Sequence, residues 1–175
     1  MYDIVIVGGG PAGVTAALRA RELGANVALV ERDRLGGTCT NDGCVPTRAL
    51  AKAARLMRDS EQFAKYGLEL PGKPTLNFPA LMKRVKNVVE EVHDKKNLLQ
   101  HMDAVGIVMF NESGNSHFVD AHTVHTENLG DVQGERFVLC VGGHARKLPF
   151  EGAEHTLTSS DVWDMERLPQ SIAII

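Results

Sequence analysis

The sequence is poor in the features that mark several large classes of protein. It has only three cysteines in 175 residues, which excludes the disulfide framework of small secreted proteins. It has no basic cluster: the 19 Lys and Arg are scattered and the net charge is -3, which argues against nucleic acid or an anionic membrane as a partner. It has no internal repeat or low-complexity tract. The N-terminus lacks a basic region, a long apolar run and a cleavage site, so we expect a cytoplasmic protein without a membrane anchor.

The N-terminal segment predicts a strand, a helix and a second strand. An apolar run of strand length covers residues 4–7, and the glycines that follow end it sharply. Small and helix-forming residues run from Pro11 to about residue 23, with Gly24 after them, and a second apolar run covers residues 27–30. Such a unit is right-handed with parallel strands, so both strands end at the same edge of the sheet, where cofactors bind.

The remaining segments predict an α/β fold with a parallel sheet, a small antiparallel β-meander and a long helical excursion. The excursion comprises a helix over 47–57, an irregular surface connection over 60–78 and a long amphipathic helix over 79–102. Short β-type runs between residues 105 and 141 predict a strand that returns to the parallel sheet, followed by the meander. Residues 172–175 resemble the start of another buried strand.

A glycine-rich loop joins the first strand to the first helix. Gly8, Gly10 and Gly13 satisfy the spacing G-x-G-x-x-G, which allows a tight turn, a close approach of the backbone to a pyrophosphate and close packing of helix on strand. Glu31 ends the second strand, about twenty residues further on, where a carboxylate accepts ribose hydroxyls. The alternative is a turn whose glycines serve packing alone, with Glu31 a solvated acid. The loop predicts a dinucleotide site, and by itself it does not separate FAD from NAD.

Two cysteines lie close together where the next helix begins. On an ideal helix, Cys39 and Cys44 would have Cα atoms about 8 to 9 Å apart, whereas a disulfide needs less than about 7 Å. If they pair, the backbone between them must curl more tightly than a helix, and the turn-forming residues 41–43 would allow it. A helix N-terminus also favours the reactive thiolate.

Three interpretations of the pair remain open. A redox disulfide fits the short spacing and the neighbouring glycine loop. A zinc site needs two further Cys or His ligands at compatible spacing, and none stands nearby. His122 and His125 are three apart in a β-type stretch, so they face opposite sides and we predict no metal there. The third interpretation is two unrelated thiols.

Together these segments resemble the start of the pyridine nucleotide-disulfide oxidoreductases, a family that includes dihydrolipoamide dehydrogenase, glutathione reductase and mercuric reductase. The resemblance rests on residues 8–13 with Glu31, on Gly36-Gly37-Thr38-Cys39 and on Gly43-Cys44-Val45-Pro46. It implies a Rossmann-like FAD/NAD(P)-binding domain that holds FAD. It also implies that Cys39 is the thiol that attacks the substrate and that Cys44 lies against the flavin.

The same resemblance assigns the other residues that contact the cofactor. Arg48 stands where the family usually has Lys near the flavin; Arg keeps the charge, but it is bulkier and does not readily lose its proton. Residues 114–120 resemble the segment that contacts the adenine, with Ser116 in place of Ala, and Gly142 matches the glycine that ends a strand beside the cofactor. The predicted set is Gly8, Gly10, Pro11, Ala12, Gly13, Glu31, Arg32, Gly37, Thr38, Cys44, Arg48, Gly114, Ser116 and Gly142.

The resemblance also implies an organisation and a function. Residues 1–168 would be the incomplete N-terminal portion of the FAD-binding domain, and residues 169–175 the first strand of a truncated NAD(P)-binding domain. The full enzyme would be a homodimer that takes electrons from NAD(P)H and reduces a small-molecule or lipoyl-type disulfide, or a metal ion, and this fragment would be inactive alone. The alternative is a stand-alone flavin-binding or thiol-based electron-transfer module.

Overall fold

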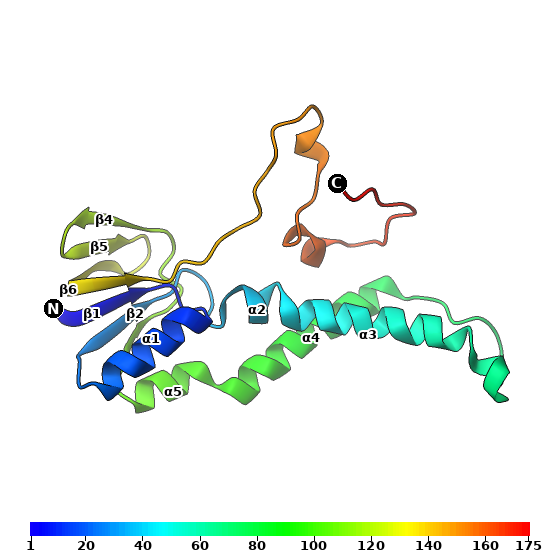
Figure 1. Cartoon of the computed structure of the whole chain (residues 1–175), viewed down its shortest axis with the longest axis horizontal. Helices are drawn as coiled ribbons and strands as arrows, with labels where there is room; N and C mark the ends of the chain where they lie inside the picture. The colour runs from blue at the N-terminus through cyan, green and yellow to red at the C-terminus, as the bar shows by residue number, and fades with distance from the viewer. The chain divides into compact units, whose positions relative to one another are not determined.

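The computed structural model describes all 175 residues, which divide into two compact units. Unit 1 comprises residues 1–41 and 93–144, and unit 2 comprises residues 42–92 and 145–175. The chain passes from one unit to the other between residues 41 and 42, inside the segment that carries Cys39 and Cys44. Figure 1 follows the chain by colour from one terminus to the other.

Unit 1 is built on one six-stranded sheet in the order β3-β2-β1-β6-β5-β4. Its first four strands are parallel, and β5 pairs antiparallel with both β6 and β4. The long strand β6 serves both parts, because its first half pairs with β5 and its second half with β1. The strands are β1 Tyr2–Val7, β2 Val27–Val30, β3 Val108–Phe110, β4 Ser116–Asp120, β5 Thr123–Thr126 and β6 Gly130–Leu139 (Figure 1).

Two apolar layers form because side chains alternate between the faces of the parallel strands. One layer joins Ile6 and Leu29 to Ala17 of α1 and Met102 of α5, all with no exposed surface. The opposite layer joins Val5 and Val7 of β1 to the meander, through Val124 of β5 and Val132 of β6. The helices of unit 1 are α1 Pro11–Glu22, the short α2 Gly37–Asn41 and α5 Leu98–Ala104.

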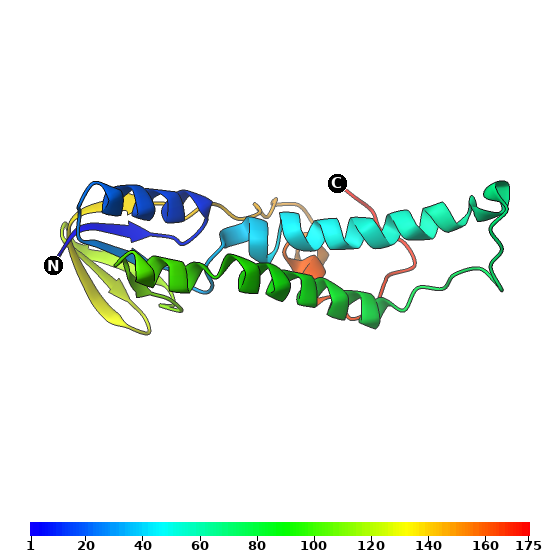
Figure 2. The ribbon, with the colours of Figure 1, turned by 90° about the horizontal axis from the view of Figure 1, so that it is seen from below.

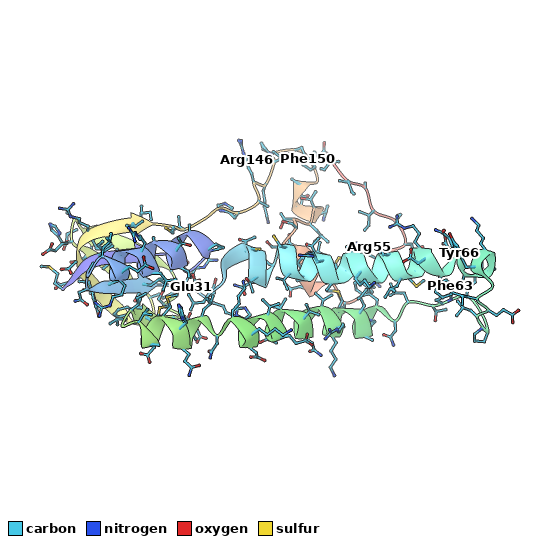
Figure 3. The ribbon with its side chains drawn as sticks, turned by 60° about the horizontal axis from the view of Figure 1, so that its bottom comes forward. Glu31, Arg55, Phe63, Tyr66, Arg146 and Phe150 are labelled. Atoms are coloured by element: carbon cyan, nitrogen blue, oxygen red, sulfur yellow. The ribbon has the colours of Figure 1, made fainter.

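Unit 2 contains a pair of long helices, α3 Cys44–Ser60 and α4 Phe78–Lys96, the latter ending in unit 1. They run antiparallel and side by side (Figures 1 and 2). Helix α4 buries Met82, Val85 and Val89, which share one face. The short 3-10 helix η1 Phe63–Tyr66 follows α3 (Figure 3), and η2 Ala153–His155 and η3 Asp161–Asp164 lie near the C-terminus. None of the helices has the length and apolar character needed to cross a membrane.

The predicted fold class is confirmed, and one predicted helix is wrong. The helix expected over 79–102 is interrupted at Asn97, which adopts a left-handed conformation with φ 42° and separates α4 from α5. Asparagine tolerates this conformation better than most residues. Separately, residues 172–175 form no strand in the structure, where they are exposed and pair with no other segment. Their assignment to a second domain stays a prediction.

We predict that Met102→Ala lowers the free energy of unfolding by about 2–5 kcal/mol, because it leaves a cavity in a fully buried layer. Leu99→Ala on the same helix is the matched control: Leu99 is 47% exposed, so its loss should change stability by less than about 0.5 kcal/mol. Urea unfolding of the two variants measures the difference. Equal losses would contradict the placement of α5 on the sheet.

Candidate functional site

The glycine loop is a tight turn between β1 and α1 in which two glycines are required by packing. Gly8 has φ 108°, and a Cβ on it would lie 2.3 Å from the carbonyl oxygen of Cys140. A Cβ on Gly13 would lie 1.8 Å from the carbonyl oxygen of Gly8. Both distances are far below any normal contact, so these positions exclude larger residues on packing grounds alone.

Gly10, unlike Gly8 and Gly13, is not required by packing. A Cβ on Gly10 would lie 3.7 Å from the Cα of Gly37, an ordinary contact, so packing does not explain the glycine. Gly10 is also the N-cap of α1, where no side chain caps the first backbone N–H groups. Such groups, with the positive end of the helix dipole, bind anions. Pro11 has no N–H, so the open Gly10 and the uncapped N–H groups of Ala12 and Gly13 are what fit a pyrophosphate, as the sequence predicts.

Helix α2 begins directly against this loop. Gly37 has φ 61°, and a Cβ on it would lie 2.8 Å from the Cα of Gly10. The backbone N–H of Gly36 donates a hydrogen bond to the carbonyl of Gly9 at 2.9 Å. The helix that carries Cys39 is therefore fixed at its start to the predicted phosphate loop.

Glu31 lies at the end of β2, next to the glycine loop (Figure 3). Its Oε2 accepts a hydrogen bond from the Gly9 N–H at 2.6 Å, and its Oε1 accepts one from the Asp33 N–H at 2.9 Å. The structure thus brings Glu31 to the loop, as the sequence predicts. Arg32 is exposed, and its hydrogen bond to Asp33, 2.8 Å long, raises the pKa of Arg32.

The segment after β3 joins the same edge of the sheet. Ser113 is fully buried, and its N–H donates to the carbonyl of Glu31 at 3.0 Å. Gly114 likewise donates to the carbonyl of Arg32 at 3.0 Å, which places the predicted adenine segment beside Glu31 and Arg32. Ser116, the first residue of β4, is exposed.

The end of β6 also reaches the glycine loop. The N–H of Cys140 donates to the carbonyl of Val7 at 2.7 Å, which sets the end of β6 beside Gly8. Gly142 follows β6 in an irregular exposed segment with φ 68°. The parallel strands thus gather most of the predicted cofactor residues of unit 1 at their carboxyl ends.

Cys39 and Cys44 lie on separate helices and are thiols in the structure, both exposed. Cys39 is inside α2, which ends at Asn41, and Cys44 is the first residue of α3. The two residues between these helices, Asp42 and Gly43, are among the turn-forming residues 41–43, while the pairing of the cysteines stays a prediction. Thr38 and Arg48 are exposed, on α2 and on the first turns of α3.

Thr40 and Asn41, between the two cysteines, are bound to the end of α4 within unit 1. Thr40 is buried, and its Oγ1 accepts a hydrogen bond from Lys96 Nζ at 3.0 Å. The Oδ1 of Asn41 lies 2.7 Å from His93 Nε2, which must carry the proton because an amide oxygen only accepts. The Nδ2 of Asn41 donates to the carbonyl of Arg34 at 3.0 Å.

Asp42, the next residue, is bound within unit 2 by residues near the C-terminus. Ser160 Oγ donates to Asp42 Oδ2 at 2.8 Å, and the indole Nε1 of Trp163 donates to the Asp42 carbonyl at 2.6 Å. Every residue from 40 to 42 therefore has a hydrogen-bond partner that is far away in the sequence.

Sequence reasoning missed these partners. No motif in the sequence assigned His93 a partner, whereas His93 is half-buried against Asn41. A signal was present, because His93 continues the spacing of four that joins the buried Val85 and Val89 on α4. No local pattern points from Ser160 or Trp163 to a residue about 120 positions earlier.

We predict that alanine destabilises the protein far more at one glycine of the loop than at another. Gly13→Ala should lower the free energy of unfolding by about 2–3 kcal/mol or more, because its Cβ overlaps the Gly8 carbonyl. Gly10→Ala should cost less than about 1 kcal/mol, because its Cβ meets only an ordinary contact and alanine is merely a poorer N-cap. Denaturant unfolding measures both. A loss for Gly10→Ala as large as that for Gly13→Ala would show that packing requires both glycines.

Comparison with known proteins gives one family over almost the whole chain. Residues 2–175 match the family described as "Pyridine nucleotide-disulphide oxidoreductase". A dihydrolipoyl dehydrogenase of Bacillus subtilis (strain 168) is 33% identical, over 99% of this chain and 39% of the relative. Dihydrolipoyl dehydrogenase 2 of Haloarcula marismortui is 31% identical over 99% of this chain and 37% of the relative. A glutathione reductase of Nostoc sp. is 30% identical over the same shares. The chain thus spans about two fifths of the length of these relatives.

Proposed function

Because this chain belongs to the pyridine nucleotide-disulphide oxidoreductase family, we propose that the whole protein carries electrons from NAD(P)H through FAD to a Cys39–Cys44 disulfide and then to a substrate. The observation that carries the proposal is the contact between Gly10 and Gly37. It joins the loop that fits a pyrophosphate to the helix that bears Cys39. A nucleotide site and a redox thiol on the same short segment are what such a relay needs.

The residues of unit 1 would hold FAD along the carboxyl edge of the sheet. The N–H groups at the start of α1 would bind the pyrophosphate, and the open backbone at Gly10 would let it approach. Glu31 would accept the ribose hydroxyls, and the segment from Gly114 would lie on the adenine side. When bound, FAD supplies a two-electron relay between the nicotinamide and the cysteine pair.

The two thiols would divide the chemistry between them. The Cys39 thiolate attacks one sulfur of a substrate disulfide, forms a mixed disulfide and releases the first substrate thiol. Cys44 then attacks Cys39, which releases the second thiol and leaves the Cys39–Cys44 disulfide. Cys44 begins α3, where no side chain caps the helix N-terminus.

The substrate we propose is a small disulfide of the lipoyl or glutathione type. The named relatives are dihydrolipoyl dehydrogenases and a glutathione reductase, which supports this class over Hg(II). It also favours the enzyme over a stand-alone electron-transfer module. We further propose that the whole protein is a homodimer, as the resemblance of the sequence implies.

The decisive test is turnover by the full-length protein loaded with FAD. We expect NAD(P)H oxidation with lipoamide or glutathione disulfide, and a loss of about a thousandfold or more in Cys39→Ser and Cys44→Ser. Cys140→Ala is the matched control, because Cys140 is a half-buried thiol that lies outside the pair. Undiminished turnover in Cys39→Ser would remove that residue from the mechanism.

We also expect one added methyl group in the glycine loop to lower the affinity for FAD. Gly10→Ala should weaken FAD binding by about tenfold or more, because its Cβ would occupy the space that the pyrophosphate approaches. Gly72→Ala is the control, since a Cβ there meets no atom within 4 Å. Flavin fluorescence titration of the apoproteins measures both affinities. Unchanged affinity in Gly10→Ala would place the cofactor elsewhere.

A further inference from the structure

Asp42 and Gly43 form the one Asp-Gly pair in the chain, and they lie between the two cysteines. An aspartate followed by glycine is the dipeptide most prone to isomerise, because glycine has no side chain that would hinder ring closure onto its backbone nitrogen. The chain has no Asn-Gly pair, which reacts in a similar way. The peptide bond most exposed to this reaction therefore lies in the loop between Cys39 and Cys44.

The isomerisation needs no co-reactant other than water. The backbone nitrogen of Gly43 bonds to Cγ of Asp42, a C–O bond of the carboxyl group breaks, and the carboxyl OH leaves as water with the amide proton. Water then opens the succinimide ring. Opening at the backbone carbonyl gives isoaspartate, whose backbone runs through the side chain and is one methylene longer. The modification would therefore lengthen the loop between Cys39 and Cys44.

The fold holds both groups that must rotate before the ring can close. The Asp42 carboxyl group has to turn toward the Gly43 nitrogen, and the peptide unit that joins the two residues has to turn toward the carboxyl group. Ser160 Oγ donates a hydrogen bond to Asp42 Oδ2 at 2.8 Å, which resists the first rotation. Trp163 Nε1 donates to the Asp42 carbonyl oxygen at 2.6 Å, which resists the second.

The two donors are themselves fixed in one turn of unit 2. Ser160 is the N-cap of η3, and Trp163 lies within η3 and is half-buried. Asp161 Oδ2 accepts a hydrogen bond from the backbone N–H of Thr158 at 2.6 Å and another from its hydroxyl at 2.7 Å. These bonds lower the pKa of Asp161, so its carboxylate stays ionised and keeps accepting them at neutral pH. Asp42 belongs to the same unit as its two donors.

We propose that Asp42–Gly43 is a latent isomerisation site and that Ser160 and Trp163 protect it, because their hydrogen bonds hold the carboxyl group and the peptide unit away from the geometry of ring closure. The inference goes beyond the proposed function and does not depend on it. Each bond has to break before the ring forms. Each therefore lowers the rate by the Boltzmann factor of its net strength, about fivefold for an ordinary hydrogen bond.

The experiment follows isoaspartate in the full-length protein during incubation at physiological temperature and neutral pH. Methylation by an isoaspartyl methyltransferase counts the modified residues, and mass spectrometry with electron-transfer fragmentation locates them. We expect Ser160→Ala and Trp163→Phe each to accelerate isomerisation at residue 42 about fivefold over the wild-type protein. Phenylalanine keeps an aromatic ring and lacks the N–H donor. Ser160→Ala keeps the test open if Trp163→Phe does not fold.

Three controls separate local protection from loss of the fold. Ser159→Ala changes the adjacent exposed residue and should isomerise at the wild-type rate. Met102→Ala leaves a cavity in unit 1 and should not accelerate the reaction while the protein stays folded, because Asp42 lies in unit 2. In concentrated urea the wild-type protein and both variants should share one rate, faster than that of the folded wild-type protein, because the protecting hydrogen bonds are lost.

The outcomes decide the proposal. Isoaspartate that rises in Ser160→Ala and disappears when Asp42→Glu is added supports it, because the longer glutamate side chain would have to close a larger ring. Wild-type rates in both Ser160→Ala and Trp163→Phe would overturn the protection. So would a folded wild-type protein that isomerises as fast as the unfolded chain. Equal acceleration in Met102→Ala would also overturn it, because global unfolding would then explain the effect.

Discussion

The close approach of two backbones, Gly10 and Gly37, is the constraint on which the candidate site depends. A side chain at Gly37 would push α2 away from the glycine loop, because its Cβ would lie 2.8 Å from the Gly10 Cα. Helix α2 carries Cys39 two residues further on. The distance between the glycine loop and Cys39 is therefore set by contacts between backbone atoms.

The segment between the cysteines is held in place by hydrogen bonds to residues outside it. Thr40 and Asn41 are hydrogen-bonded to Lys96 and His93 in unit 1. Asp42 is hydrogen-bonded in unit 2 to Ser160 and to Trp163 of η3. A short loop rich in turn-forming residues would otherwise sample many conformations, and fixing it in one of them costs conformational entropy. Hydrogen bonds to residues distant in the sequence therefore fix the conformation of this loop, as the hydrogen bonds of the sheet fix the conformation of the strands.

The sequence allowed prediction of the fold wherever the pattern was local. The order of residue types predicts the strand–loop–helix start and the position of Glu31 at the end of β2. It failed at Asn97, where a single left-handed residue interrupts an otherwise continuous apolar period. It also missed His93 and Trp163, because their roles depend on contacts 52 and 121 residues away. The periodicity of apolar residues carries no information about such contacts. The exception is His93, which continues the spacing of the buried residues Val85 and Val89 on α4.

The two hydrogen bonds of Glu31 have a consequence for recognition. Both carboxylate oxygens are already held by backbone N–H groups, so the side chain is ordered before any ligand arrives. A free glutamate loses up to about 1.5–2 kcal/mol of rotamer freedom when it is immobilised. The Glu31 side chain loses this rotamer freedom when the protein folds, so ligand binding does not cost it a second time. The same negative charge is fixed in place, so it would disfavour a phosphate group brought beside it.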